Sequence, residues 1–139
     1  MKAMKNLIIF PLFLIVFGIC AQTKPIKVVF DVTSSDEAIH RMVMRHVTLM
    51  AEAYPESEFA VVVYGGALPM LISGSSTVSE EVLKFQNNKK ISILACEGTM
   101  NRFEVKDDQL LSGVKSIPDG IYELAIKQSE GWAYIKESN

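Results

Sequence analysis

Short apolar runs that alternate with helical patterns are the feature of this sequence that most constrains its fold. Residues 59–64, Phe-Ala-Val-Val-Val-Tyr, form a continuous apolar run that ends at two glycines. A strand has this composition when both of its faces are buried, which is typical of parallel sheets. Further strands are predicted at 26–32, 91–95, 114–117 and 132–135.

Helical patterns fill the intervals between these runs. From Ile39 to Tyr54 apolar residues recur at steps of three and four, and Pro55 ends the pattern. Ser34 and Glu37 have capping-box spacing, which predicts that this helix begins there. Shorter helical segments are expected at 67–72, 77–87 and 121–128, and from Thr99 onward. The alternation predicts an α/β fold, a three-layer α/β/α sandwich with a mostly parallel sheet of about five strands.

The first 21 residues have the pattern of a secretory signal peptide. Two lysines precede an apolar run over 7–17, and Ala21 supplies a small residue at its exit. The apolar segment is shorter than the roughly 20 residues that span a bilayer as a helix. We therefore expect 1–21 to be a signal peptide and 22–139 to be a single domain without a membrane span. The protein would be exported, in the simplest case to the periplasm.

The positions of the two cysteines bear on how the protein is processed and on whether it can form a disulfide. Cys20 ends the apolar segment, so a lipid anchor on Cys20 is an alternative to simple cleavage; the large Ile19 before it disfavours that alternative. If cleavage follows Ala21, Cys96 is the one remaining thiol and no internal disulfide can form. A lone cysteine in an exported protein indicates a reactive thiol, an intermolecular bridge or a buried side chain.

Charge and motifs exclude several classes of ligand. Removing Lys2 and Lys5 changes the formal charge from −2 to −4, whereas a nucleic-acid-binding protein needs a basic face. The chain has neither a phosphate-binding GxxxxGK[ST] motif nor a dinucleotide fingerprint. His40 and His46 are six residues apart and point to different faces of a helix, so they form no metal pair. We predict no metal and no cofactor.

Candidate site residues lie where the predicted strands end, since ligands of parallel sheets collect beyond the carboxyl ends of the strands. Cys96 is the strongest nucleophile at these ends. The expected pocket residues around it are Asp31, Tyr64, Gly65, Gly66 and Asp119.

Cys96 could be activated by its neighbours. Backbone N–H groups around Gly98 and Thr99, and a cation at Arg102, would lower the pKa of its thiol, while Glu97 would raise it. The alternative is a buried, inert cysteine, because free cysteine is among the most buried residue types.

Several segments resemble the DsrE-like family. Residues 95–102, Ala-Cys-Glu-Gly-Thr-Met-Asn-Arg, resemble its A-C-x-x-T-M segment. Further matching segments are LLSGV at 110–114, IPDGI at 117–121, QSEGWAYI at 128–135 and KVVFDV at 27–32. The resemblance implies a compact α/β/α sandwich. It also implies a sulfur-relay role, in which a cysteine accepts sulfur as a persulfide and passes it to a partner, often within trimers or hexamers.

The functional prediction is an exported thiol-based sulfur carrier or transferase that uses Cys96, with a protein as sulfur donor or acceptor. The alternative is a non-catalytic module of the same fold for small-ligand binding or assembly. Whether the protein turns over a substrate as an enzyme stays open. A homo-oligomer, a trimer or hexamer, is expected. Methionines suit adaptable contact faces or fill the core, and this chain has them at 42, 44, 50, 70 and 100.

Overall fold

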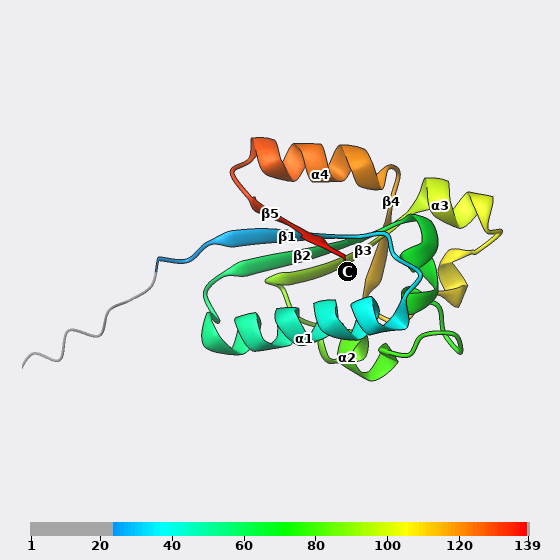
Figure 1. The fold of residues 1–139 in the computed structure, drawn as a ribbon, viewed down its shortest axis with the longest axis horizontal. Helices are drawn as coiled ribbons and strands as arrows, with labels where there is room; N and C mark the ends of the chain where they lie inside the picture. Colours follow the sequence, from blue (N-terminus) through cyan, green and yellow to red (C-terminus); the bar gives the residue numbers. More distant parts are fainter. Residues whose placement is uncertain (1–23, 139) are drawn as a thin grey trace, which may run out of the picture.

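The computed structural model describes residues 24–138, in which a five-stranded sheet forms the centre of the molecule (Figure 1). Its order is β4-β3-β2-β1-β5, and every neighbouring pair is parallel. The strands are β1 Lys27–Val32, β2 Glu58–Val63, β3 Ile91–Cys96, β4 Val114–Ile117 and β5 Ala133–Glu137. The predicted α/β/α class with its parallel sheet is confirmed. The predicted signal peptide, 1–21, lies outside the described residues.

Helices cover both faces of this sheet. Helix α1 and the short α2 lie on one face, and α4 lies on the other (Figure 1). The helices are α1 Glu37–Ala53, α2 Ser79–Lys84, α3 Glu97–Arg102 and α4 Gly120–Ser129, with 3₁₀ turns η1 Gly65–Leu71 and η2 Asp107–Gln109. Within residues 24–138, none of these helices combines the length and the apolar character needed to cross a membrane.

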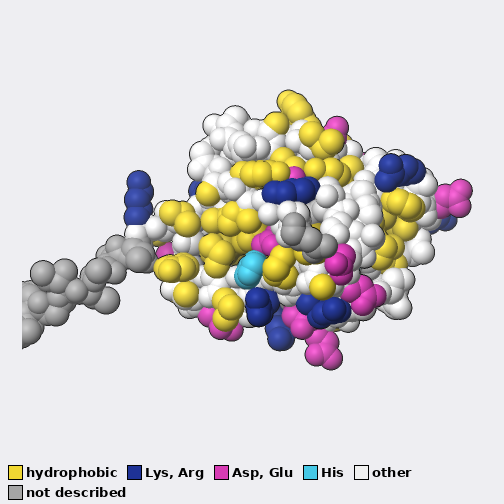
Figure 2. Space-filling view, viewed as in Figure 1, with side chains coloured by type: hydrophobic (Ala, Val, Ile, Leu, Met, Phe, Trp, Pro, Cys, Tyr) yellow, Lys and Arg dark blue, Asp and Glu magenta, His cyan; other side chains and the backbone are white. Residues whose placement is uncertain are grey.

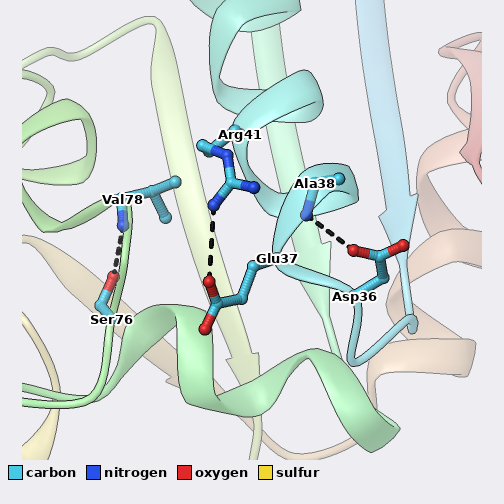
Figure 3. Close-up of polar contacts among 6 residues, drawn as sticks. All are labelled: Asp36, Glu37, Ala38, Arg41, Ser76 and Val78. Carbon is cyan, nitrogen blue, oxygen red and sulfur yellow. Dashed lines mark hydrogen bonds and ion pairs between the residues drawn. The ribbon is translucent and has the colours of Figure 1, made fainter.

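Helix α1 begins differently from the predicted capping box. Asp36, not Ser34, is the N-cap, and its Oδ1 accepts a hydrogen bond of 2.8 Å from the N–H of Ala38 (Figure 3). Ser34 acts one turn earlier, because its hydroxyl accepts from the N–H of Asp36 at 3.1 Å. Asp is as good a cap as Ser, so the carboxylate nearer the helix takes the role. Glu37 instead reaches Arg41, at 3.5 Å.

Helix α2 is shorter than the predicted 77–87. It spans Ser79–Lys84, and the turn that leads into it is held by the Ser76 hydroxyl, which accepts from the N–H of Val78 at 3.1 Å (Figure 3). The backbone then leaves the helix at Phe85, which caps its end. Val82 is the residue of α2 that is buried in the core.

The two faces of the sheet have different cores. On the α1 face the larger core includes Phe30, Phe59, Val43 and Leu68. Met44, Met70 and Met100 belong to it, and Met42 and Met50 pack against it. Three of these methionines are therefore core residues, and Met42 and Met50 lie half-buried at the margin of this core. On the α4 face the buried residues are Val29, Ala60, Val62, Leu94 and Leu124.

Strand alternation places the candidate residues together. Successive residues of a strand point to opposite faces, so Asp31 shares the α4 face with Val29, and Cys96 shares it with Leu94. Tyr64 directly follows β2 and packs against the same cluster. Three predicted residues from three adjacent strands thus reach one edge, the carboxyl end of the α4 face.

Candidate functional site: a cysteine between two helix starts

Cys96 lies where two helices begin. It is the last residue of β3 and the N-cap of α3, and it is only 8% exposed. The start of α4 packs directly on it, because a Cβ added to Gly120 would lie 3.3 Å from the Cβ of Cys96 and 3.3 Å from Val62 Cγ1. Glycine at 120 therefore allows the backbone of α4 to approach the thiol closely.

Hydrogen-bond donors surround the sulfur. Burial raises the pKa of the Cys96 thiol, but the backbone N–H groups of Gly120, Thr99 and Gly98 and the Thr99 hydroxyl act against it. Together these donors outweigh burial, so the pKa lies below its ordinary value of 9.0. The cause is that each donor stabilises the thiolate and not the thiol.

Thr99 connects the sulfur to the turn after β2. Its Oγ1 accepts a hydrogen bond of 3.1 Å from the N–H of Gly65, so the hydroxyl hydrogen is left to donate to Cys96. Gly65 has a φ of +60°, a left-handed backbone conformation that glycine adopts at little cost. Thr99, predicted to support the thiol, and Gly65, a predicted pocket residue, are thus brought together with the cysteine.

Asp31 is a buried carboxylate with two donors from the neighbouring strand β5. The Tyr134 hydroxyl donates to its Oδ2 at 2.5 Å, and the Lys136 ammonium donates to its Oδ1 at 2.9 Å. Lys136 also donates to Thr33 Oγ1 at 2.8 Å. These bonds compensate the carboxylate for the loss of water, which a buried charge requires.

Tyr64 lies between the cysteine and this carboxylate. Burial and the Asp31 carboxylate raise the pKa of Tyr64 to about 12, and a thiolate at Cys96 adds to the effect. Its hydroxyl is therefore protonated at neutral pH, and Tyr64 is no base. The hydrogen bond to Asp31 and burial likewise raise the pKa of Tyr134 to about 12.

The other predicted residues have supporting positions. The Asp119 carboxylate caps α4, accepting from the N–H of Ile121 at 2.9 Å and of Tyr122 at 3.1 Å. Gly66 packs tightly, because a Cβ there would lie 3.2 Å from the carbonyl oxygen of Thr33. Arg102 is at the far end of α3, where its guanidinium lies 4.8 Å from the centre of the Phe103 ring. It is not among the groups that lower the pKa of Cys96.

Three residues of the site, Gly120, Tyr134 and Lys136, are not among the predicted site residues. Gly120 was part of a predicted turn, but its N–H contact with Cys96 depends on how α4 crosses the sheet. Tyr134 lies in the strand predicted at 132–135, but Lys136 lies one residue beyond it, and only the longer observed strand β5 places both on one face. The contact of these two residues with Asp31 could not be inferred from the sequence, because that contact requires β5 to pair with the outer side of β1.

These features define a class: an α/β/α protein with an all-parallel sheet and a donor-surrounded cysteine at the end of an inner strand. A family model agrees with this, since the model of the DsrE/DsrF-like family matches residues 27–136. The chain belongs to the DsrE/DsrF-like family.

Solved structures share the fold. MTH1491 from Methanobacterium thermoautotrophicum, a protein of unknown function, is 26% identical with a TM-score of 0.74, covering 80% of this chain and 98% of its own. BT1422 from Bacteroides thetaiotaomicron, a conserved protein of unknown function, is 16% identical with a TM-score of 0.64, covering 79% of this chain and 93% of its own. The ychN protein from E. coli is 13% identical with a TM-score of 0.64, covering 82% of this chain and 99% of its own. A search of the curated proteins found no match.

Proposed function

We propose that this protein is a thiol-based sulfur carrier or transferase, in which Cys96 takes up sulfur as a persulfide and passes it to a partner. The observation that carries the proposal is the set of donors at the sulfur, from Gly98, Thr99 and Gly120. The thiolate is the nucleophilic form of cysteine, and a lowered pKa increases its share at neutral pH.

Sulfur uptake at this site needs no oxidant and no cofactor. The Cys96 thiolate attacks the outer sulfur of a donor persulfide, R–S–SH, and a new S–S bond forms. The S–S bond of the donor breaks, and R–S⁻ leaves with the electron pair and later takes a proton from water. Cys96 is left as a persulfide, Cys96–S–SH, and transfer to an acceptor thiolate repeats the same exchange.

The donors that favour the thiolate also suit the persulfide. A persulfide anion carries negative charge on its sulfur atoms, and N–H groups fixed by two helix starts can stabilise it without rearrangement. The neutral phenol of Tyr64 adjoins the site and brings no competing negative charge. A sulfur donor protein and an acceptor protein belong to the proposal.

A second candidate, a non-catalytic binding or assembly module, is favoured by the low exposure of the cysteine. At 8% exposure, Cys96 presents little of its surface to a donor sulfur, and a closed site would leave it inert. The two candidates differ in whether the folded protein reacts at Cys96.

Sulfur loading tests the proposal directly. The folded protein is exposed to inorganic polysulfide, and the peptide containing Cys96 is examined by mass spectrometry. We expect the mass gain of one sulfur atom, which is reversed by a reducing agent and is absent in Cys96→Ser. Loading that appears only after unfolding would reject the carrier and support the assembly module.

We further propose that the protein is exported and works as a homo-oligomer, a trimer or hexamer. Figure 2 shows hydrophobic side chains gathered on the face where β5 lies in front, between α4 and α1. Exposed apolar residues of these elements are Leu49, Ile121, Tyr122, Tyr134 and Ile135. A surface of this kind is typical of a contact between proteins.

A further inference from the structure

Lys136 is held beside the cysteine site by contacts that the proposed chemistry does not use. It lies near the end of β5, where it is the direct partner of Asp31 in the sheet register. Its ammonium donates to Asp31 at 2.9 Å and to Thr33 at 2.8 Å. Both contacts fix the ammonium at the carboxyl edge of the α4 face.

One aromatic ring separates this ammonium from the thiol. Lys136 Nζ lies 5.7 Å from the centre of the Tyr64 ring. On the other side, a Cβ added to Gly120 would lie 3.4 Å from Tyr64 Cδ1 and 3.3 Å from the Cβ of Cys96. Tyr64 thus lies near both groups: Lys136 is next to its ring, and Cys96 is near enough for a thiolate there to raise the pKa of the Tyr64 hydroxyl. The ammonium is therefore placed beside the thiol site, at the same edge of the sheet.

The two members of the Asp31–Lys136 ion pair differ in their exposure to solvent. The side chain of Lys136 is 38% exposed, whereas that of Asp31 is 5% exposed. Solvent thus meets the positive end of the pair first. An ammonium has three N–H donors, and Asp31 and Thr33 take two of them, so a donor remains for an arriving anion.

We propose that Lys136 is a specificity residue that draws a small anionic sulfur donor, of the polysulfide class, to Cys96. This inference rests on the proposed function. Lys136 touches neither the thiol nor the bond that breaks; it raises the local concentration of the donor and orients its negative end. The selected property of the donor is its charge, so a neutral reagent gains nothing from Lys136.

A pair of alkylating reagents measures this selectivity. Iodoacetate is an anion and iodoacetamide is neutral, and both attack the same thiolate, so the ratio of their rates cancels any change in thiol pKa. The rates are followed on the peptide that contains Cys96. We expect Lys136→Met to lower the iodoacetate-to-iodoacetamide ratio about two- to fivefold, the effect of one charge at this range in a largely aqueous path.

Matched variants distinguish the effect of the Lys136 charge from a structural effect of the substitution. Lys27→Met removes the same charge from an exposed ion pair with Glu58 at the opposite end of β1, and should leave the ratio unchanged. Lys136→Arg should keep the ratio, since it keeps the charge. Asp31→Asn should raise it, because Lys136 then loses its negative partner. A merely structural role of the pair would move the ratio in the same direction in Asp31→Asn and Lys136→Met.

The outcomes distinguish this inference from the proposed function. If Cys96 in the folded protein reacts with neither reagent, the carrier proposal fails. If both reagents react and Lys136→Met has the same ratio as Lys27→Met, the role of Lys136 is rejected while the carrier proposal stands. As a second readout, Lys136→Met should slow loading by inorganic polysulfide by a similar factor at low salt, and high salt should remove the difference. Polysulfide loading at the wild-type rate would also reject the role.

Discussion

At the scale of single residues, Cys96 is balanced between two opposing effects. Burial favours its neutral thiol, and hydrogen bonds from Gly120, Thr99 and Gly98 favour its thiolate. The donors prevail because they are backbone groups at helix starts, where N–H groups lack partners within the helix. The reactivity of this residue is therefore a property of the backbone around it.

The pH dependence of alkylation tests this balance. Because the pKa of Cys96 is below 9.0 in the folded protein, its rate with iodoacetamide should reach half-maximum at a lower pH than in the denatured chain. The measurement follows the Cys96 peptide by mass spectrometry, which separates it from Cys20. A midpoint at or above that of the denatured chain would show that burial prevails.

The same pKa shift predicts a pH-dependent stability. Folding lowers the pKa of Cys96, so between the folded and the unfolded pKa the unfolded chain binds more protons, and the free energy of unfolding rises with pH. This contribution is complete above the unfolded pKa and is lost as the pH falls through the folded pKa. Cys96→Ser lacks it. The difference in unfolding free energy between wild type and Cys96→Ser, measured with denaturant, should therefore grow toward pH 9 and stay constant if the pKa is unshifted.

Gly120→Ala tests the close approach of α4. Its added methyl would lie 3.3 Å from Cys96 Cβ and Val62 Cγ1 and 3.4 Å from Tyr64 Cδ1, so either the helix start or these side chains must shift. We expect a loss of about 1–3 kcal/mol in unfolding free energy, as for other overpacked sites. The pKa of Cys96 should rise, because a hydrogen-bond donor is lost.

Gly98→Ala is the matched control for this change. It also adds a methyl beside Cys96, but at an ordinary contact distance of 3.7 Å from Sγ. Since alanine is favoured over glycine in a helix, stability should not fall. Equal losses in both variants would contradict the role of Gly120.

At the scale of elements, the N-cap of α4 positions one of the hydrogen-bond donors of the site. Asp119 accepts hydrogen bonds from the N–H groups of Ile121 and Tyr122, which fixes the first turn of the helix. The N–H of Gly120, one residue after the cap, is thereby directed at Cys96. Asp119, a predicted pocket residue, therefore acts on the sulfur indirectly, through the helix start that it caps.

Asp119→Ala should have two effects. Loss of an N-cap costs about 0.5–2 kcal/mol of stability, which denaturant unfolding measures. The looser helix start should also raise the pKa of Cys96 and slow its alkylation at neutral pH. Asp36→Ala is the control, since it removes the cap of α1 on the other face. Similar slowing in Asp36→Ala would attribute the effect to general destabilisation.

Local patterns explain why the elements could be predicted and parts of the site could not. The strand predictions agree with β1 to β5 within two residues, because apolar runs and turn residues act over short distances. The donors at Gly98 and Thr99 are also local, since they follow Cys96 directly. Strand order is a long-range property. Lys136 reaches Asp31, 105 residues away, only because β5 pairs with β1, and no local pattern indicates that pairing.

At the scale of the whole molecule, export is a prediction that rests on the segment before the described residues. The basic start, the apolar run and Ala21 form the pattern of a cleaved signal. N-terminal sequencing of the protein from the periplasmic fraction should begin at or near Gln22. An intact Met1 in soluble cytoplasmic material would contradict export, and a lipid-modified Cys20 would establish the anchor instead.

Assembly is the prediction that concerns the surface as a whole. The described sheet ends at β5, whose outer edge has no neighbouring strand, and Ile135 on it is exposed. A lysine at such an edge disfavours pairing with a second chain. We therefore expect Ile135→Lys to shift the mass measured by light scattering at micromolar concentration from an oligomer to a monomer. Phe103→Lys changes an equally apolar, exposed residue beyond α3 and should keep the oligomer. A monomeric wild type over this range would reject assembly, and dissociation by Phe103→Lys alone would place the contact on another face.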